Sequence, residues 1–331
     1  MKRLLPLILL LTLGGMSPLW SASVPAAEAS REVVSTQREP LKPIPLEVNV
    51  DARKVALGRM LFHETKLSHD NSVSCASCHD LHRGGVDQRK HSLGIHQAEG
   101  SINAPTVFNS AGSIRQFWNG RAATLEDQID GPIVATEEMG STWEEVLAKL
   151  RGVPEYVASF KRIYPDAIQA KNVRNAIAEF ERSLNTPNSR FDKFLRGDKS
   201  ALTADEKEGY RKFKSYGCTS CHQGVNVGGN MFETLGAMAD YFADRGGATK
   251  VDLGRFNVTG NEEDRYVFKV PSLRNVARTA PYLHDGSAAT LEQAVTIMGR
   301  YQLGECLPPA DVAQIVQFLK TLTGEYEGKQ L

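Results

Sequence analysis

Two short stretches of the chain carry the same three chemical groups. Each has two cysteines three positions apart and a histidine directly after the second: Cys75, Cys78 and His79 in SCASCH, and Cys218, Cys221 and His222 in CTSCH. Thiols at this spacing lie about one turn apart on one face, so both sulfurs can bond to the two vinyl edges of a single porphyrin. The histidine then lies beneath the ring, where a ring nitrogen can bind the iron. The pattern predicts two covalently attached c-type haems.

Other uses of paired cysteines fit these stretches less well. A structural zinc site usually has its two cysteine pairs roughly 12 to 20 residues apart, and its geometry gives the adjacent histidines no role. A thioredoxin-like redox motif needs a βαβ surrounding and no histidine after the second cysteine. Cys306, in GECLPP, has no cysteine left to pair with, and we expect a buried, inert thiol there.

Each motif supplies one axial ligand, so the group on the other face of each iron decides between electron transfer and catalysis. A thioether raises the potential and closes the site, whereas an open or displaceable position lets a small molecule bind. Methionine candidates for the second motif are Met231, Met238 and Met298. Met298 ends the amphipathic stretch LEQAVTIMG, where a methionine taken alone is more often core filling than a ligand. The first motif has histidines and the pair Glu137 and Glu138 nearby, and a glutamate beside a haem would be a general acid and base.

The N-terminus has the features of a secretory signal peptide. A basic start is followed by the apolar run LLPLILLLTL, which is too short to span a bilayer. Ala27-Glu28-Ala29 fits a cleavage site, so we expect residues 1–29 to be removed; an uncleaved N-terminal anchor is the alternative. The 39 Lys and Arg residues equal the 39 Asp and Glu residues in number, which favours neither nucleic acid nor a lipid surface as a partner.

The elements that must position these residues are expected to be mainly helical. Apolar periodicity predicts helices over 51–62, 171–184, 290–301 and 309–322, and capping boxes at Ser141–Glu144 and Thr203–Glu206 predict two more helix starts. Only 266–270 has a strand pattern. The loops 80–123, 222–265 and 275–289 are long, which is typical of functional segments. The two motifs divide the mature chain into 30–187 and 188–331, joined near TPNSRFDKFLRGD (186–198).

The ordered motifs of the chain resemble those of the bacterial dihaem cytochrome c peroxidases, the family that includes the MauG-type enzymes. The resemblance runs nearly end to end through ALGRMLFHETKLSHDNSVSCASCH, INAPTVFN, FWNGRAATLEDQIDGPI, CHQGVNVGG, YVFKVPSLRNVARTAPYLHDG and AVTIMGRYQLG. It implies two cytochrome-c-like domains, a peroxidatic one at the N-terminus and an electron-transferring one at the C-terminus. It also implies two covalently bound haem c groups and a calcium ion between the domains.

The resemblance implies roles for single residues as well. These are Trp118 between the haems, Gln128 and Glu138 in the active site, Met298 as axial ligand, and Asn103 with the carbonyls of Thr279 and Pro281 around calcium. Oxygen ligands of this kind suit a hard cation. One motif departs from the family, in which a displaceable histidine follows S-[IL]-G. Here Ile95 occupies that place and His96 comes one step later, so both a capped and an open N-terminal iron remain in question.

These features predict a periplasmic peroxidase that reduces hydrogen peroxide to water with electrons from a small monohaem cytochrome c or a cupredoxin. Peroxide is expected opposite His79, with Glu138 moving a proton and Trp118 passing an electron from the second haem. A dihaem electron carrier is one alternative. The other is a MauG-like oxidase of a partner protein, which is expected to have tyrosine where this chain has Met298. We expect no membrane span after signal cleavage, and a homodimer is expected from the family alone.

Overall fold

The computed structural model describes residues 39–331, and the predicted signal peptide lies outside this range. The helices are α1 (Ala52–Phe62), α2 (Cys75–Cys78), α3 (Leu125–Val134), α4 (Trp143–Arg151), α5 (Pro154–Ile163), α6 (Ala170–Ser183), α7 (Arg190–Leu195), α8 (Ala204–Ser215), α9 (Tyr241–Asp244), α10 (Phe256–Thr259), α11 (Leu291–Ile297) and α12 (Pro309–Lys320). Two short antiparallel pairs join β1 (Phe232–Thr234) to β2 (Val267–Lys269) and β3 (Glu325–Tyr326) to β4 (Lys329–Gln330). The predicted mainly α fold is confirmed.

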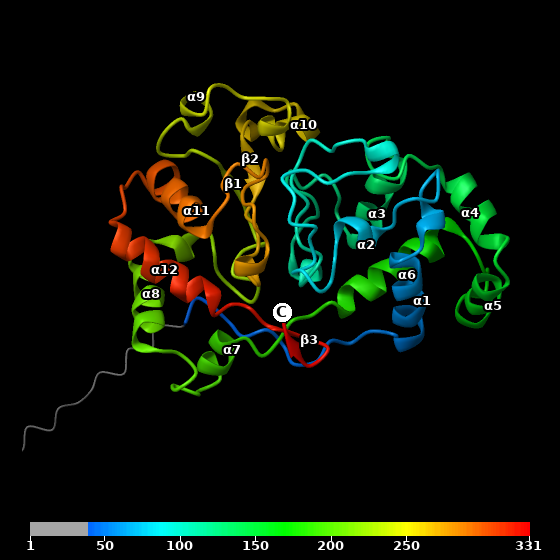
Figure 1. Ribbon diagram of the computed structural model, residues 1–331, viewed down its shortest axis with the longest axis horizontal. Coiled ribbons are helices and arrows are strands. Elements are labelled where there is room, and N and C mark those ends of the chain that lie inside the picture. The colour runs from blue at the N-terminus through cyan, green and yellow to red at the C-terminus, as the bar shows by residue number, and fades with distance from the viewer. Residues whose placement is uncertain (1–38) are drawn as a thin grey trace, which may run out of the picture. The chain divides into compact units, whose positions relative to one another are not determined.

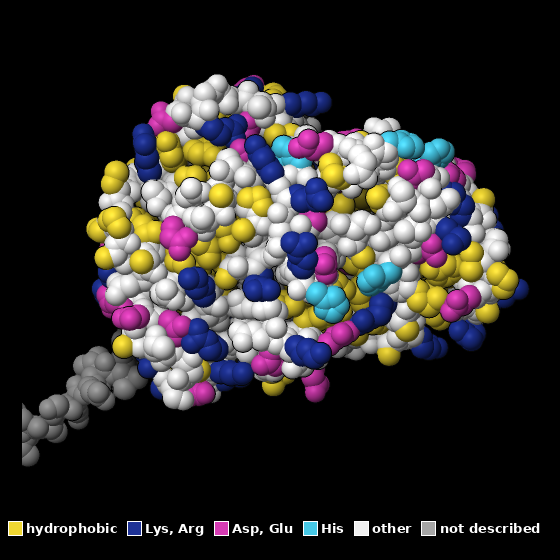
Figure 2. Space-filling model, in the orientation of Figure 1, with side chains coloured by type: hydrophobic (Ala, Val, Ile, Leu, Met, Phe, Trp, Pro, Cys, Tyr) yellow, Lys and Arg dark blue, Asp and Glu magenta, His cyan; other side chains and the backbone are white. Residues whose placement is uncertain are grey.

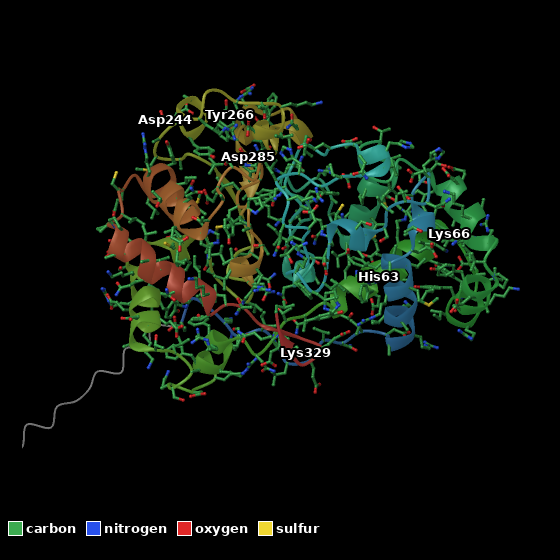
Figure 3. The ribbon with its side chains drawn as sticks, viewed as in Figure 1. His63, Lys66, Asp244, Tyr266, Asp285 and Lys329 are labelled. Carbon is green, nitrogen blue, oxygen red and sulfur yellow. The ribbon has the colours of Figure 1, made fainter. Side chains whose placement is uncertain are left out.

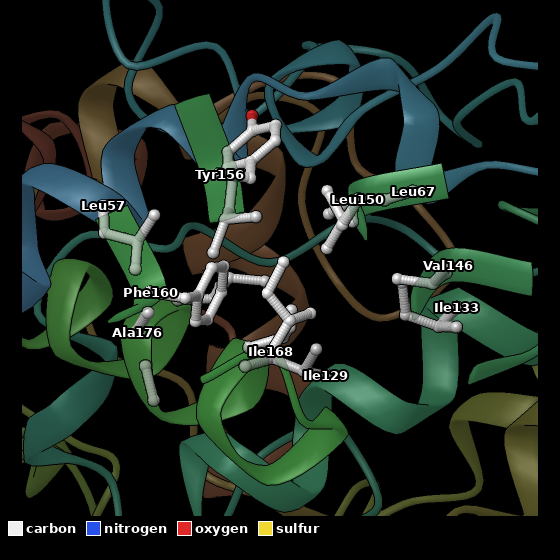
Figure 4. Close-up of a cluster of buried hydrophobic side chains, with 14 of the residues drawn as sticks. Leu57, Leu67, Ile129, Ile133, Val146, Leu150, Tyr156, Phe160, Ile168 and Ala176 are labelled. Atoms are coloured by element: carbon white, nitrogen blue, oxygen red, sulfur yellow. The ribbon is translucent and has the colours of Figure 1, made fainter. Parts of the chain in front are cut away.

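One hydrophobic core lies among the helices that follow the first motif along the chain, together with α1 (Figure 1). Leu57 of α1 and Ala176 of α6 meet in it, and Phe160 of α5 fills the space beside them (Figure 4). Asp51 caps α1 by accepting the backbone N–H of Arg53. The core therefore fixes α1, the helix that leads into the first motif, against α3 to α6.

A second core lies among α7, α8, α11 and α12, which Figure 1 shows grouped together. Phe318 of α12 is fully buried and packs edge-on against Phe191 of α7, with ring centroids 5.0 Å apart. The ring of Phe213 of α8 also packs against Phe318, with ring centroids 5.1 Å apart. Since α8 ends three residues before Cys218, this packing fixes the position of the second motif.

Several segments cross between the two cores. The C-terminal hairpin packs Tyr326 against Phe108, with ring centroids 5.1 Å apart, in a cluster that also includes Cys75. Arg274 is 1% exposed and donates to the carboxylate of Asp192 at 2.9 Å and to the carbonyl of Lys42 at 2.7 Å. The division into domains 30–187 and 188–331 stays a prediction.

The structure confirms most predicted elements and corrects four details. The capping box at Thr203 is present, but the one at Ser141 is wrong by one residue: Thr142 caps α4, because Ser141 is buried and its hydroxyl donates to Glu145. Segment 222–265 is not a bare loop, since it contains β1, α9 and α10. The helix predicted over 290–301 changes at Met298 into a π-helical turn, η8 (Met298–Leu303). Cys306, expected to be buried, is exposed, because it lies in the short link between η8 and α12.

The surface carries both signs of charge. Figure 2 shows basic and acidic side chains interspersed over the visible face, with no large area of one sign. Within residues 39–331, the helices are too short or too polar to cross a bilayer.

Candidate active site at the two cysteine-histidine motifs

The first motif forms the short helix α2 and the residue after it. The Nδ1 atom of His79 lies 3.1 Å from the carbonyl oxygen of Gly85. Gly84 and Gly85 have φ values of 83° and 74°, which glycine adopts without strain, so the chain can turn back and present this carbonyl. With its Nδ1 proton donated there, the ring keeps a lone pair on Nε2 for a metal. Burial lowers the pKa of His79, which also favours the neutral ligating form.

The second motif repeats this arrangement with different local structure. Cys218–Ser220 form the 3₁₀ turn η4, and the Nδ1 atom of His222 lies 3.2 Å from the carbonyl oxygen of Val227. Burial lowers the pKa of His222 to about 4, so the imidazole is neutral at neutral pH. Both histidines thus present Nε2 as the free ligand atom.

The four motif cysteines are free thiols with raised pKa values. Burial is the main cause, and it raises the pKa of Cys75 to about 12 and those of Cys78 and Cys218 to about 11; the pKa of Cys221 is raised as well. A catalytic redox dithiol needs a lowered pKa, because the thiolate is the nucleophile. The thioredoxin-like alternative is therefore disfavoured, and the thiols suit thioether attachment.

A cavity of about 300 Å³ adjoins the second motif. Cys218, Cys221 and His222 line it together with Met298, and most of the remaining wall is apolar. Met298 lies where α11 passes into the π-helical turn, a distortion often found at functional positions. Of the three methionines that the sequence offered, Met298 lines this cavity, whereas Met238 is 64% exposed. These residues fit a flat apolar group held by two thioethers, one imidazole and one thioether ligand.

Trp118 lines the same cavity and is held from two directions. Its Nε1 donates to the carbonyl of Asn103 at 2.9 Å, and its own carbonyl accepts the backbone N–H of Lys269 at 2.8 Å. The three predicted calcium ligands, Asn103, Thr279 and Pro281, also line this cavity. The Nδ2 of Asn103 donates a hydrogen bond to the carbonyl of Arg89 at 2.9 Å, which leaves the side-chain amide oxygen free to bind a metal ion.

Glu138 lies close to the first motif. Burial raises its pKa, the charge of Arg121 opposes the rise, and Glu137 adds to it. The charge of Glu138 also contributes to the raised thiol pKa values of Cys75 and Cys78, after the larger effect of burial. Gln128 lies half-buried on α3, and its side chain makes no hydrogen bond within residues 39–331. The structure therefore brings Glu138 to the first motif, whereas no direct bond joins Gln128 to it.

A tight hairpin over residues 92–100 packs against Glu138. Backbone N–H groups of Gly94 and Gly100 close the hairpin, and that of Ile95 donates to the carbonyl of Glu138 at 2.8 Å. A Cβ atom on Gly94 would lie 2.2 Å from the carbonyl oxygen of Glu137, so this close approach needs glycine. Ile95 is buried, whereas the side chain of His96 is 70% exposed, with Nδ1 3.6 Å from the Asp70 carboxylate. In this conformation the hairpin turns Ile95 inward and His96 outward.

Two further charged residues near the motifs, Arg121 and Glu181, escaped the sequence analysis, and a third titratable residue, His284, lies in the long loop 275–289 but was given no role. The guanidinium of Arg121 lies 3.3 Å from the ring centroid of Phe117, within reach of Glu138; its position in FWNGR was the available signal. Glu181 of α6 is 6% exposed and close enough to Cys75 to raise that thiol's pKa, after burial as the larger cause. His284 is buried, with Nε2 2.7 Å from the Asp252 carboxylate and its ring edge-on to Trp118 at 6.4 Å. No spacing pattern marks these last two residues.

The described residues contain one group of three metal-ligating side chains, Asp252, His284 and Asp285. Figure 3 shows Asp285 in the same region as Asp244 and Tyr266. The guanidinium of Arg245 contacts both carboxylates of the group. An arginine thus supplies the positive charge, and the group is an internal ion-pair network.

Comparison with known proteins adds a family and several relatives. The family model described as "Di-haem cytochrome c peroxidase" matches residues 52–200. Cytochrome c peroxidase Ccp of Escherichia coli K12 is 51% identical over 300 residues, which cover 90% of this chain and 64% of that protein. Cytochrome c551 peroxidase of Nitrosomonas europaea is 46% identical over 308 residues, which cover 93% of this chain and 90% of that protein. The crystal structure of a MauG-like protein associated with microbial copper homeostasis superposes with a TM-score of 0.74 at 28% identity, covering 93% of this chain and 96% of that one.

Proposed function

Because the chain belongs to the di-haem cytochrome c peroxidase family, we propose that it reduces hydrogen peroxide to water in the periplasm with electrons from a small monohaem cytochrome c or a cupredoxin. The balanced reaction consumes one peroxide, two electrons and two protons and yields two waters. The observation that carries the proposal is the difference between the two motif surroundings. A half-buried acid, Glu138, lies beside the first motif, and a thioether, Met298, lies in the cavity of the second.

Cys75 and Cys78 would hold one haem c, and Cys218 and Cys221 the other. When bound, these groups supply the iron that binds peroxide and the capacity to hold electrons. The chain contributes Nε2 of His79 and of His222, each oriented through its Nδ1 bond to a backbone carbonyl. Met298, which lines the cavity of the C-terminal motif, would offer its thioether as a ligand there, and a site held in this way would exclude small molecules.

Glu138 is proposed as the proton-transfer group. Its raised pKa brings the carboxyl closer to neutral pH, where it can give and take a proton in the same reaction. The charge of Arg121 opposes that rise in pKa, because it favours the ionised carboxylate. Glu138 would take a proton from one peroxide oxygen and deliver it to the other, while Gln128 orients the substrate.

Trp118 is proposed as the route for electrons between the two sites. It lines the cavity of the second motif, while its neighbour Phe117 contacts Arg121, whose charge reaches Glu138. Residues on one turn of chain thus extend toward both motifs. The hydrogen bonds to Asn103 and Lys269 hold this turn in place.

Calcium is proposed at Asn103, Thr279 and Pro281. The carbonyls of Thr279 and Pro281 accept no hydrogen bond from residues 39–331, and the Asn103 amide oxygen is the atom left over from the bond to Arg89. Calcium favours neutral and anionic oxygen donors of this type. A chelator should therefore lower the activity of the holoprotein, and added Ca²⁺ should restore it.

The proposed function is tested by stopped-flow mixing of the oxidised and the half-reduced holoprotein with hydrogen peroxide, followed by optical spectroscopy. We expect the half-reduced protein to consume one peroxide per two electrons taken from a reduced donor cytochrome. A protein that stays six-coordinate at both irons and unreactive toward peroxide would be an electron carrier instead. A protein that consumes peroxide only when a partner protein is oxidised would act as the MauG-type enzymes do.

A further inference from the structure

The cavity of the second motif has one strongly cationic side chain on its wall. Among the described residues, Lys269 of β2 is the sole lysine or arginine there, and Glu233 of β1 is the sole carboxylate. The rest of the wall is apolar or neutral at physiological pH, apart from the buried histidines already described. A charge in such a place requires an explanation, because an unpaired cation in an apolar site is costly.

Lys269 has no counter-ion in the described part of the chain. Its side chain is half-buried, its ammonium makes no ion pair with a carboxylate of residues 39–331, and burial lowers its pKa to about 8. Glu233 is excluded by the register of the two strands, which places Glu233 opposite Phe268 and Lys269 opposite Phe232. Directly opposite residues share a face of a sheet, so the two charged side chains leave from different faces.

We propose that Lys269 is the counter-ion of a carboxylate side group of the haem attached at Cys218 and Cys221. A haem carries two such carboxylates, and a carboxylate enclosed by apolar residues needs a cation or several hydrogen-bond donors. Lys269 is the cation that this cavity provides. The inference rests on the proposed binding of haem at the second motif, and it does not depend on peroxide being the substrate.

This contact would join the haem to the electron route. The backbone N–H of Lys269 donates to the carbonyl of Trp118 at 2.8 Å, so one residue would hold both the haem carboxylate and the tryptophan backbone. A positive charge beside the haem also favours the ferrous state, because reduction adds a negative charge. Lys269 is therefore assigned as a positioning residue that raises the potential of the C-terminal haem.

The test compares three variants of the holoprotein: Lys269→Met removes the charge, Lys269→Arg keeps it, and Lys250→Met removes one from an exposed position in the same half of the chain. Spectroelectrochemical titration measures the potential of the C-terminal haem. Denaturant unfolding measures the stability of each holoprotein. The potential reports whether the charge acts on the haem, and the direction of the stability change reports whether the charge is paired.

We expect Lys269→Met to lower the ferrous-to-ferric ratio of that haem about tenfold at a fixed potential, which is 59 mV for a one-electron couple. We also expect it to destabilise the holoprotein, because the haem carboxylate loses its partner. Lys269→Arg should keep most of both properties, and Lys250→Met should change neither. If Lys269→Arg gives holoprotein and Lys269→Met does not, that result also shows that loss of the charge destabilises the holoprotein.

The inference is overturned if Lys269→Met raises the stability of the holoprotein and leaves the potential of the C-terminal haem unchanged. If the ammonium is unpaired, Lys269→Met removes an uncompensated, half-buried charge and stabilises the protein, with a potential no different from that of Lys250→Met. Failure of both Lys269→Arg and Lys269→Met to give holoprotein would mean that the cavity needs the shape of lysine and not its charge. Since neither measurement uses peroxide, a failed peroxidase assay and a failed Lys269 test are separate outcomes.

Discussion

The segments that follow the two motifs share one local structure and differ in the side chains that carry chemistry. AATLE occurs at 122–126 and again at 288–292, and in both places its threonine caps a helix through a capping box. The turn before each copy is closed by one isolated bridge, Gln116 with Ala122 in the first and Tyr282 with Ala288 in the second. The two segments are thus counterparts, position by position.

Outside AATLE most positions differ between these counterparts, and four of the differences bear on the proposed chemistry. They pair Asn103 with Lys269, Trp118 with His284, Arg121 with Ser287, and Pro132 with Met298. Proline has no ligating atom, so the first segment offers nothing where the second offers a thioether. Even the backbone contacts are exchanged: the N–H of Asn103 donates to the carbonyl of His284, and that of Lys269 to the carbonyl of Trp118. On this common scaffold, single side chains make the two sites chemically different.

The largest expected effect comes from removing the acid at the first site. Glu138→Gln keeps the shape of the side chain but cannot transfer the proton, so we expect peroxide turnover to fall about 10²-fold or more, as for a lost general acid and base. Steady-state turnover with a reduced cytochrome measures it. Glu137→Gln is the matched control, because Glu137 is the exposed neighbour and should lose little. If the losses are reversed between the two variants, the proton-transfer role belongs to Glu137.

The second effect should alter the closed site alone. Met298→His replaces a thioether by an imidazole, which favours ferric iron more strongly. Axial ligands set haem potentials over about 0.8 V, so we expect the C-terminal potential to fall by on the order of 0.1 V. Met238→His is the control, since Met238 is exposed. Potentials that are equal in the two variants would make Met298 a core residue without a ligand role.

The family and the mainly α fold could be predicted from the sequence, and both predictions are confirmed. Cysteine spacing with an adjacent histidine is a local signal, so it needs no knowledge of the tertiary structure. Helix ends were less certain because neighbours compete: at α4 the buried Ser141 gives way to Thr142 as the cap. The site residues taken from the family resemblance stay predictions, although the cavity brings Met298, Trp118 and Asn103 together.

The roles of Glu181 and Lys269 could not be predicted, for a physical reason. A glutamate on a helix and a lysine on a short strand are usually surface residues, and only the tertiary structure shows that Glu181 is buried and Lys269 half-buried. The same limit applies to His96, whose neighbour Asp70 comes from a distant turn. Spacing identifies residues that act together along the chain, whereas partners brought by folding leave no pattern.

The third prediction concerns access to the first site. We propose that His96 caps the N-terminal iron in the resting protein and that the outward conformation, with His96 beside Asp70, is the released one. His96→Gly should then let the fully oxidised protein bind peroxide at once, without prior reduction by one electron. The optical spectrum should show high-spin iron before peroxide is added.

Asp70→Asn provides the opposite perturbation, because it weakens the contact that holds His96 outward. Exposed ion pairs are weak, so we expect the activated fraction to fall only on the order of a few-fold. A wild-type protein that is already high-spin and fast when oxidised, and that His96→Gly leaves unchanged, would mean that Ile95 keeps the site open and that no gate exists.

The last prediction concerns stability and not activity, at the buried acid beside the first motif. Glu181 is 6% exposed, and burial raises its pKa from 4.5 to about 8, with Arg182 opposing the rise and Glu126 adding to it. Between pH 4.5 and about 8 the folded protein keeps a proton on Glu181 that the unfolded chain has lost. The free energy of unfolding therefore falls as the pH rises from about 4.5 to about 8, by at most about 1.4 kcal/mol per pH unit from this group. Glu181→Gln should remove that part of the slope when urea unfolding of the holoprotein is measured at pH 6 and pH 8, whereas the exposed Glu144→Gln should not. Parallel profiles for wild type and Glu181→Gln would show that the carboxyl ionises normally despite its burial, and the first motif would then have no buried neutral acid beside Cys75.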